Sequence, residues 1–264
     1  MKYLFVAAIL FGLDASIALG QWQVQAILSQ ADFRGLSVVS PKVAWVSGTK
    51  GTYARTFDSG KTWTVGTVPG AEKLDFRDVE AFGEKKAYLL SAGPGDASRI
   101  YKTTDGGKSW TKQFQSADPG SFFDALAFWD EKNGIALGDP VDGRFQLIAT
   151  DDGGNWKSLP NKNLPPALPN EGAFAASGTC LITLGKDDVW FATGGAKVAR
   201  VFHSGDRGRS WEVSDTPIMA GAPSAGIFSI AFRDKKNGIL VGGDYRKPND
   251  LGATTAVTAD GGKT

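Results

Sequence analysis

The chain has little of what metal sites and nucleophilic catalysis require. Its 264 residues include one cysteine, Cys180, and one histidine, His203. A single cysteine excludes an internal disulfide framework and a cysteine-rich zinc site. A single histidine excludes a multi-histidine metal site and argues against a Ser-His catalytic pair. We therefore expect neither a metal nor a cofactor.

Net charge and long apolar runs are also scarce. The 29 Lys and Arg residues balance 28 Asp and Glu residues, which leaves a net charge of +1. Such a chain lacks the basic surface that attracts nucleic acid or anionic membranes. No apolar run beyond residue 20 is long enough to predict a membrane span. Glycine, in contrast, is abundant at 34 residues, which favours many short strands joined by tight turns.

The first twenty residues have the order of a secretory signal. Lys2 supplies a positive charge, residues 3–13 are apolar, and small residues lead to Gly20. This order predicts a cleaved signal peptide over residues 1–20 and a secreted or periplasmic protein. The alternative is a buried first strand or helix. Residues 21–264 then form one domain.

One motif, Asp-x-Gly-x-Ser/Thr-Trp, recurs along that domain. Its aspartates and tryptophans are Asp58 and Trp63, Asp105 and Trp110, Asp151 and Trp156, Asp206 and Trp211, and Asp260 in a copy that stops before its tryptophan. The aspartates are 46 to 55 residues apart. A period near 50 residues with strand-like content indicates one propeller blade per repeat. A hydroxyl residue lies two positions before the aspartate in every copy except the third, which has Ala149.

The motif suits a tight turn between two strands. Its aspartate can accept hydrogen bonds from turn N–H groups, and its glycine can adopt positive φ. Its tryptophan then begins the next strand and packs between sheets, which is worth roughly 3–5 kcal/mol for a buried tryptophan. We expect these residues to be structural and not catalytic.

Each period divides into four strands. In the third period the strands are expected at residues 123–128, 134–138, 144–150 and from 155 onward. We therefore predict an all-β propeller of about five four-stranded blades. Residues 21–30 are expected to lend a fourth strand to the last blade. Either five blades close directly, or the chain is C-terminally incomplete, which its stop inside a motif favours.

The repeats resemble known propellers. The motif is similar to the Asp-box, or BNR repeat, and the glycine-rich second strands at residues 45–51 and 135–139 precede Asp58 and Asp151. Together they resemble the photosystem II stability and assembly factor-like family. That resemblance implies seven blades and a non-catalytic chaperone that binds a partner protein through an arginine-rich patch. No residue of that patch can be placed here.

Topology predicts where a ligand would bind. Loops joining second to third strands, and each blade to the next, vary in length and share one end of the blades. Irregular loops on a rigid scaffold concentrate binding residues. The candidate rim consists of Arg34, Arg77, Asp78, Asp124, Asp139, Arg144, Asp244, Tyr245 and Arg246.

Three functions remain open on the sequence. We favour a secreted, non-catalytic propeller that binds a protein or peptide. The alternative is a sialidase-like glycoside hydrolase or a glycan-binding propeller, and the third is another enzyme whose site lies partly outside this chain. A glycosidase needs two carboxylates facing a sugar. Asp78 and Asp124, which we expect at equivalent positions of neighbouring blades, are the candidate pair.

Overall fold

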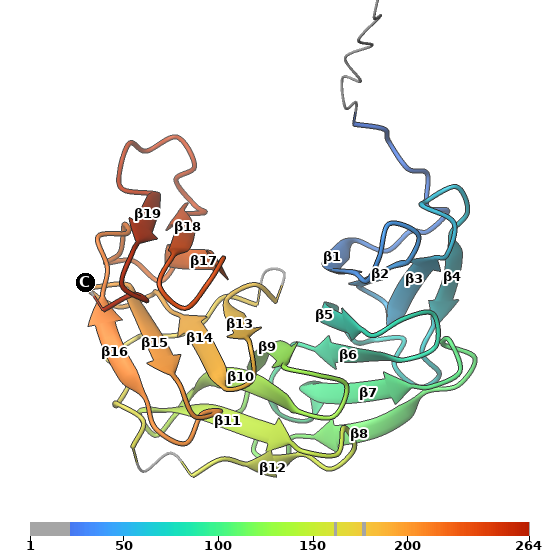
Figure 1. Ribbon diagram of the computed structural model, residues 1–264, viewed down its shortest axis with the longest axis horizontal. Helices are drawn as coiled ribbons and strands as arrows, with labels where there is room; N and C mark the ends of the chain where they lie inside the picture. Colours follow the sequence, from blue (N-terminus) through green and yellow to red (C-terminus); the bar gives the residue numbers. More distant parts are fainter. Residues whose placement is uncertain (1–21, 161–162, 176–177, 264) are drawn as a thin grey trace, which may run out of the picture.

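The computed structural model describes residues 22–160, 163–175 and 178–263. Within these ranges it contains nineteen strands and one short 3-10 helix. The strands form five antiparallel sheets, arranged radially as the blades of an open arc (Figure 1). The predicted all-β propeller is therefore confirmed. No helix in the described part of the chain is long and apolar enough to cross a membrane, and the expected signal peptide lies outside that part.

The blades follow one another along the chain. Blade one consists of β1 (Phe33–Val38), β2 (Ala44–Gly48), β3 (Thr52–Thr56) and β4 (Thr64–Thr67). Blade two consists of β5 (Phe76–Ala81), β6 (Ala87–Ser91), the helix η1 (Gly95–Ala97), β7 (Arg99–Thr103) and β8 (Thr111–Gln115). Blade three consists of β9 (Phe123–Phe128), β10 (Gly134–Val141), β11 (Arg144–Thr150) and β12 (Lys157–Ser158). Blade four consists of β13 (Leu181–Leu184), β14 (Asp188–Ala192), β15 (Arg200–Ser204) and β16 (Glu212–Asp215), and blade five of β17 (Ala225–Phe232), β18 (Gly238–Asp244) and β19 (Thr255–Thr258).

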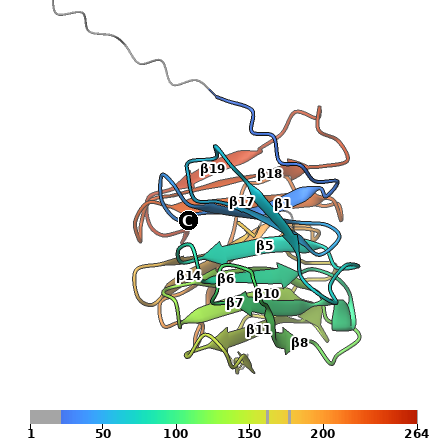
Figure 2. The same ribbon diagram turned by 90° about the vertical axis from the view of Figure 1, so that its right-hand side faces the viewer.

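Within a blade the strands run from the inside of the arc to the outside. Neighbouring strands pair in sequence order, and Figure 2 shows β5 to β8 side by side in one sheet. The inner strands β1, β5, β9, β13 and β17 contact one another in that order. The apolar second strand of each blade explains why the blades stack against one another. β2, β6, β10 and β14 bury side chains on both faces, as strands between two sheets must.

Blade five departs from the prediction because it has three strands. Residues 21–30 do not complete it: the described residues 22–30 form no strand, and Trp22 is fully exposed. Gln25 instead lies beside blade one, with its Oε1 2.9 Å from the position that a Cβ on Gly60 would take. To pair with β19, residues 22–30 would have to cross the open side of the arc. The fourth strands of the other blades need only follow a tight turn from the third strand.

Aromatic side chains join neighbouring blades. Trp45 of β2 donates its Nε1–H to the Gly83 carbonyl of blade two at 2.9 Å. Tyr88 of β6 donates to the Gly153 carbonyl of blade three at 2.9 Å. These rings are buried, and each also fills an apolar cluster between two sheets. The interfaces therefore combine apolar burial with satisfied polar groups.

The two outward faces of the arc, which we call the flanks, lack a neighbouring blade. On blade one, Leu36 and Val38 are 62% and 67% exposed. On blade five, Ile239, Val241 and Val257 are 43%, 41% and 77% exposed. Val79 and Ile135, the residues equivalent to Leu36 and Ile239 inside the arc, are buried. The flanks therefore carry the apolar pattern of a blade interface without its burial.

The recurring motif forms the turn between third and fourth strands, which we call the box turn. The Thr103 hydroxyl donates to Asp105 Oδ1 at 2.9 Å and accepts from the Gly107 N–H at 2.8 Å. Ser109 donates to the same carboxylate through its N–H at 2.9 Å and its hydroxyl at 2.6 Å. Gly107 has φ of 82°, which favours glycine.

The third box turn corrects the sequence alignment. Asp152, and not Asp151, accepts the bonds that define the turn: from the Thr150 hydroxyl at 3.0 Å and from the Asn155 N–H at 2.7 Å. The copy is one residue shorter between aspartate and tryptophan, so counting back from Trp156 selects the wrong aspartate. With this correction a hydroxyl precedes every box aspartate.

The box tryptophans differ in how far they are buried. Trp211 is 8% exposed and lies 5.0 Å from the Phe191 ring. Trp110 is half-buried and contacts Tyr53 of blade one at 5.0 Å between ring centroids. Trp63 faces the flank of blade one and joins no apolar core cluster. The packing contribution therefore depends on whether a preceding blade is present.

Candidate functional site

Each blade has two ends. The turn end carries the turns between first and second strands and the box turns. The loop end carries the loops between second and third strands and the connections between blades. Loops from blades four and five meet there: the Gly195 N–H donates to the Ala225 carbonyl at 2.9 Å, and the Met219 N–H to the Ala253 carbonyl at 2.8 Å. The variable loops of these two blades are thus joined by backbone hydrogen bonds.

Inner strands bulge where they reach the loop end. Register shifts leave one residue unpaired with the second strand in four blades, and these residues are Arg34, Arg77, Asp124 and Phe228. A bulge bends a strand and redirects the side chain of its extra residue. The register also makes Asp124 the counterpart of Arg77, so its expected equivalence with Asp78 is wrong by one position.

The two arginines share an acidic partner. Arg77 Nε lies 2.9 Å from Asp75 Oδ2, and Arg34 Nε lies 3.8 Å from Asp75 Oδ1. Arg77 also donates from Nη1 to the Ala175 carbonyl at 3.0 Å. Their positive charge is therefore partly neutralised, and Arg77 ties blade two to the connection that follows blade three.

Asp78 is buried, with 4% exposure. It accepts the Val79 N–H at 2.8 Å and the Leu126 N–H of blade three at 2.7 Å. Gly178 covers it so closely that a Cβ there would lie 2.2 Å from its Oδ1. Burial, followed by the charge of Glu80, raises the pKa of Asp78 well above its ordinary value. Its role in this geometry is to link two inner strands.

Asp124 is also buried, with 1% exposure, and its Oδ2 has no hydrogen-bond partner. Burial, followed by the charge of Asp139, raises its pKa well above the ordinary value, while Arg77 acts in the opposite direction. A carboxyl without solvent or a full set of donors is costly to ionise. Neither Asp78 nor Asp124 faces open solvent, so they do not form a pair of sugar-facing carboxylates.

A cavity of about 300 Å³ opens at the loop end between blades three, four and five. Its wall includes Asp139, Phe174 and the backbone of Gly172 and Gly194. Gly194 bridges Gly172 on one side and Gly226 on the other. A Cβ on Gly194 would lie 2.6 Å from the Gly226 Cα, so glycine is required for this close approach.

Asp139 is the acidic group in the cavity wall. It lies at a bulge in β10, is half-buried, and accepts the Ala173 N–H at 2.9 Å. Burial raises its pKa to about 6, and the Ala173 N–H opposes that shift. Among the described residues no ion pair joins Asp139 to a cation.

Three aromatic rings lie next to this cavity, and we call them the aromatic trio: Phe174, Phe228 and Tyr245. Phe174 meets Phe228 edge to face at 4.9 Å between centroids, and Tyr245 at 6.2 Å. Both phenylalanines are half-buried, whereas Tyr245 is 58% exposed. Rigid aromatic side chains of this kind are enriched in protein interfaces.

Asp244 stabilises the conformation of the loop that carries Tyr245. Asp244 is 9% exposed, its Oδ1 accepts the Arg246 N–H at 2.9 Å, and a hydrogen bond from the Ser224 side chain lowers its pKa. The structure therefore places Asp244 under the loop, with Arg246 exposed on it. Arg144 is exposed at the start of β11, and its loop contacts the neighbouring connection through the Gly143 carbonyl.

A buried ion pair supports the cavity from below. The Glu171 carboxylate accepts from Arg200 Nε at 2.8 Å and from the Thr193 hydroxyl at 2.6 Å, and Arg200 Nη2 donates to its other oxygen. The Leu168 N–H adds a fourth bond at 2.7 Å. Both oxygens of this buried carboxylate therefore accept hydrogen bonds. The ion pair holds the connection between β12 and β13 against blade four.

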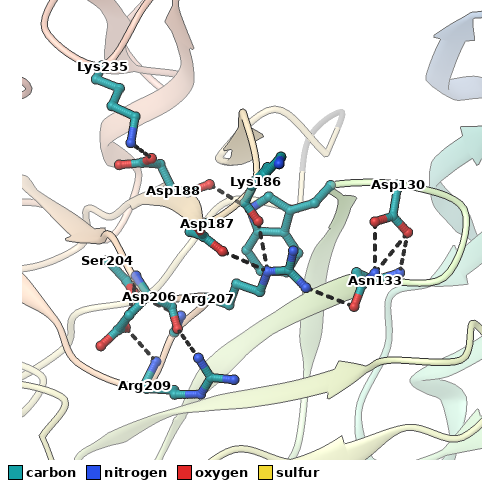
Figure 3. A network of polar contacts seen from close by, with 12 residues as sticks. Asp130, Asn133, Lys186, Asp187, Asp188, Ser204, Asp206, Arg207, Arg209 and Lys235 are labelled. Carbon is teal, nitrogen blue, oxygen red and sulfur yellow. Dashed lines mark hydrogen bonds and ion pairs between the residues drawn. The ribbon is translucent and has the colours of Figure 1, made fainter.

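The turn end holds a different polar network (Figure 3). Arg207 donates to Asn133 Oδ1 of blade three at 2.9 Å and to Asp187 Oδ1 at 3.1 Å. Asp188 pairs with Lys235 of blade five, with Nζ and Oδ2 2.6 Å apart. These contacts connect three blades through charged side chains.

A second cavity, of about 290 Å³, lies beside this network. Its wall includes Trp129 and the basic residues Lys157, Arg207 and Arg209. The Arg207 guanidinium lies 5.6 Å from the centre of the Trp129 ring. Arg207 is thus held by polar and aromatic contacts on several sides.

The single cysteine and histidine take structural positions. Cys180 is fully buried, and burial raises the pKa of its thiol well above the ordinary value. His203 stacks on Trp190 at 4.3 Å between centroids and lies 3.1 Å from Asp188 Oδ1. Among the described residues no group of three or more His, Cys, Asp or Glu side chains is arranged to hold a metal ion.

Known relatives share the propeller repeats. No family model matches the chain. The photosystem II assembly lipoprotein Ycf48 of Picosynechococcus sp. is 25% identical over 291 residues, which cover 94% of this chain and 78% of that protein. The photosystem II assembly protein Ycf48 of Synechococcus sp. is 25% identical and covers 91% and 75%. The chain is similar to the photosystem II assembly factor-like propellers.

A solved structure of YCF48 bound to a D1 peptide is 17% identical, with a TM-score of 0.43. It covers 84% of this chain and 78% of its own. At that identity the likeness concerns the fold alone. The predicted resemblance, which rested on the box repeats and second strands, is confirmed by the two relatives.

Sequence reasoning missed the residues that shape the cavity. Phe174 and Glu171 lie in the connection between β12 and β13, outside the strands that repeat, so the periodic pattern does not select them. Phe228 carried one signal: it occupies the position that Arg77 and Asp124 take in their blades. Aligning the bulges, and not the box turns, would have found it.

Proposed function

We propose that this chain is a non-catalytic propeller that binds a segment of a partner protein at its loop end. The observation that carries the proposal is the aromatic trio, in which exposed Tyr245 is supported by Phe174 and Phe228 beside a cavity. Rigid aromatic anchors beside a pocket are typical of interaction hot spots. The names of the two Ycf48 relatives, which describe assembly proteins, support a role in holding another protein.

The burial of the candidate carboxylates supports a non-catalytic role. A glycosidase acts through two carboxyl groups that flank the bond to be cleaved. Asp78 bonds to backbone N–H groups and lies under Gly178, and Asp124 is buried beneath Asp139. Neither buried carboxyl is open to a sugar, and Gly178 lies directly against Asp78.

We further propose that the protein acts outside the cytoplasm. The charge at Lys2, the apolar run at residues 3–13 and the small residues before position 21 support export through a cleaved signal. Export is tested separately, by N-terminal sequencing of the protein recovered from the periplasm or medium. A mature chain that begins at Met1 would contradict it.

The binding proposal is tested by selecting peptides from a random displayed library with the full chain. We expect binders whose affinity falls at least about tenfold in Tyr245→Ala, in line with the loss of an aromatic anchor. The matched control is Leu251→Ala, because Leu251 is fully exposed on the same loop. Binders that Tyr245→Ala leaves unchanged, or a failure to select any, would contradict the proposal.

A further inference from the structure

The loop-end cavity has an unbalanced negative charge. The Asp139 carboxylate lies in its wall, and Asp124 is buried next to Asp139 with one oxygen unpartnered. The charge of Asp139 raises the pKa of Asp124. A cation that approached Asp139 would stabilise its ionised form.

The cations nearby are committed to other acids. Arg200 is held by Glu171, and Arg77 is held by Asp75 and the Ala175 carbonyl. No ion pair within the described residues reaches Asp139. Within the part of the chain that the structure describes, this carboxyl therefore has no positively charged partner, although burial makes an unpaired charge unfavourable.

The rest of the cavity suits the stem and head of a long cationic side chain. Phe174 provides an aromatic wall, and aromatic rings attract ammonium and guanidinium groups. Gly172 leaves Asp139 uncovered, because a Cβ at that position would lie 2.7 Å from Asp139 Oδ1. A volume of about 300 Å³ is at the small end of ligand cavities and fits one side chain better than a folded partner.

We propose that this cavity receives one lysine or arginine side chain of the partner segment, with Asp139 as its hydrogen-bond acceptor and Phe174 as its aromatic wall. The inference rests on the proposed function, because it names the chemistry of the segment that the loop end binds. Tyr245 would then anchor a neighbouring apolar residue of the same segment. An ion pair in a half-buried pocket gains from charge-assisted hydrogen bonding.

The test uses small probes, so that it does not depend on finding the partner. N-acetyl-lysine methylamide and N-acetyl-norleucine methylamide are titrated into the full chain, and the backbone amide signals of Gly172, Gly194 and Gly195 are followed by NMR. We expect the lysine probe to bind at least about tenfold more tightly, as one charge-assisted bond gives. Equal binding of the two probes, or no binding of either, would overturn the inference.

Two variants locate the effect. Asp139→Asn should abolish the preference for lysine. Asp142→Asn should retain it, because Asp142 is exposed in the next turn and its φ of 51° suits asparagine. If Asp139→Asn keeps the preference, the cavity does not recognise the charge through this carboxyl.

A pH titration of the unaltered chain covers the case in which Asp139→Asn does not fold. The pKa of Asp139 is about 6, so lysine binding should weaken as pH falls through 6. The other ionisable groups around Asp139 are Asp124, which is buried next to it, and two ion pairs. The pairs are Glu171 with Arg200 and Asp75 with Arg77. Affinity for the lysine probe that is constant from pH 8 to pH 5 would contradict the role of Asp139. Selected peptides that need Tyr245 but contain no lysine or arginine would overturn this inference alone, whereas lysine binding without any selected peptide would overturn the binding function alone.

Discussion

The turn end repeats from blade to blade, whereas the loop end differs in every blade. At the turn end the same hydroxyl, carboxylate and glycine recur, as in the turns at Asp58 and Asp105. At the loop end, one connection is a three-residue turn after Gly48 and another extends from Ser158 to Leu181. A feature repeated in every blade serves what every blade needs, which is packing, whereas a feature present once can serve recognition.

The cavities at the two ends also differ in the sign of the charges in their walls and in whether those charges have partners. The turn-end cavity has Lys157, Arg207 and Arg209 in its wall, and Arg207 already has acidic and amide partners. The loop-end cavity has Asp139, which has no cationic partner among the described residues. A satisfied network favours rigidity, and an unsatisfied group favours a ligand. The loop end is therefore the better candidate for binding.

The largest expected effect is on stability at the turn end. Trp211→Ala should lower the free energy of unfolding by about 4 kcal/mol, because it removes a buried indole between two blades. Trp63→Ala should lower it by about 1 kcal/mol, since Trp63 faces the flank. Urea denaturation measures both. Equal losses would mean that packing between blades is not what the box tryptophans contribute.

A second large loss of stability is expected at the loop end, so stability does not depend on the turn end alone. Glu171→Ala should destabilise the protein by about 3 kcal/mol, because it leaves Arg200 buried and unpaired. It should also lower the affinity for the selected peptides, because Glu171 supports the cavity wall. Replacing both residues, Glu171→Leu with Arg200→Met, should restore most of the stability. If the single variant melts like the parent, the pair does not support this end.

A smaller, pH-dependent effect is expected in the box turns. The Ser109 hydroxyl, then its N–H, lowers the pKa of Asp105 to about 2 from 3.8. Because the folded pKa lies below the unfolded one, this stabilisation is present above pH 4 and is lost as pH falls towards 2. Asp105→Asn should therefore melt below the parent at pH 7, and the difference should shrink at pH 2. Melting curves across this range test it, and a constant difference would contradict it.

Sequence patterns predicted the periodic part of this molecule and missed the rest for a physical reason. The second strands and box turns were predictable because each blade solves the same packing problem with the same residue types. Asp152 was missed because a one-residue deletion leaves Trp156 in place while shifting the aspartate. The cavity was not predictable, because Phe174 and Asp139 come together only through the path of a long connection.

The smallest expected change in stability is at the flanks, which belong to neither end. Val257→Lys on β19 should alter the free energy of unfolding by no more than about 0.5 kcal/mol, because Val257 is 77% exposed. It should nevertheless reduce self-association at high concentration, since exposed apolar faces promote contact between molecules. Leu251→Lys is the control, because Leu251 is exposed on a loop away from the apolar face of the sheet. Sedimentation velocity compares the three proteins. If Val257→Lys associates as strongly as the parent while Leu251→Lys does not, self-association proceeds through the loop end, and the surface assigned to partner binding would also be the one that copies of this chain use.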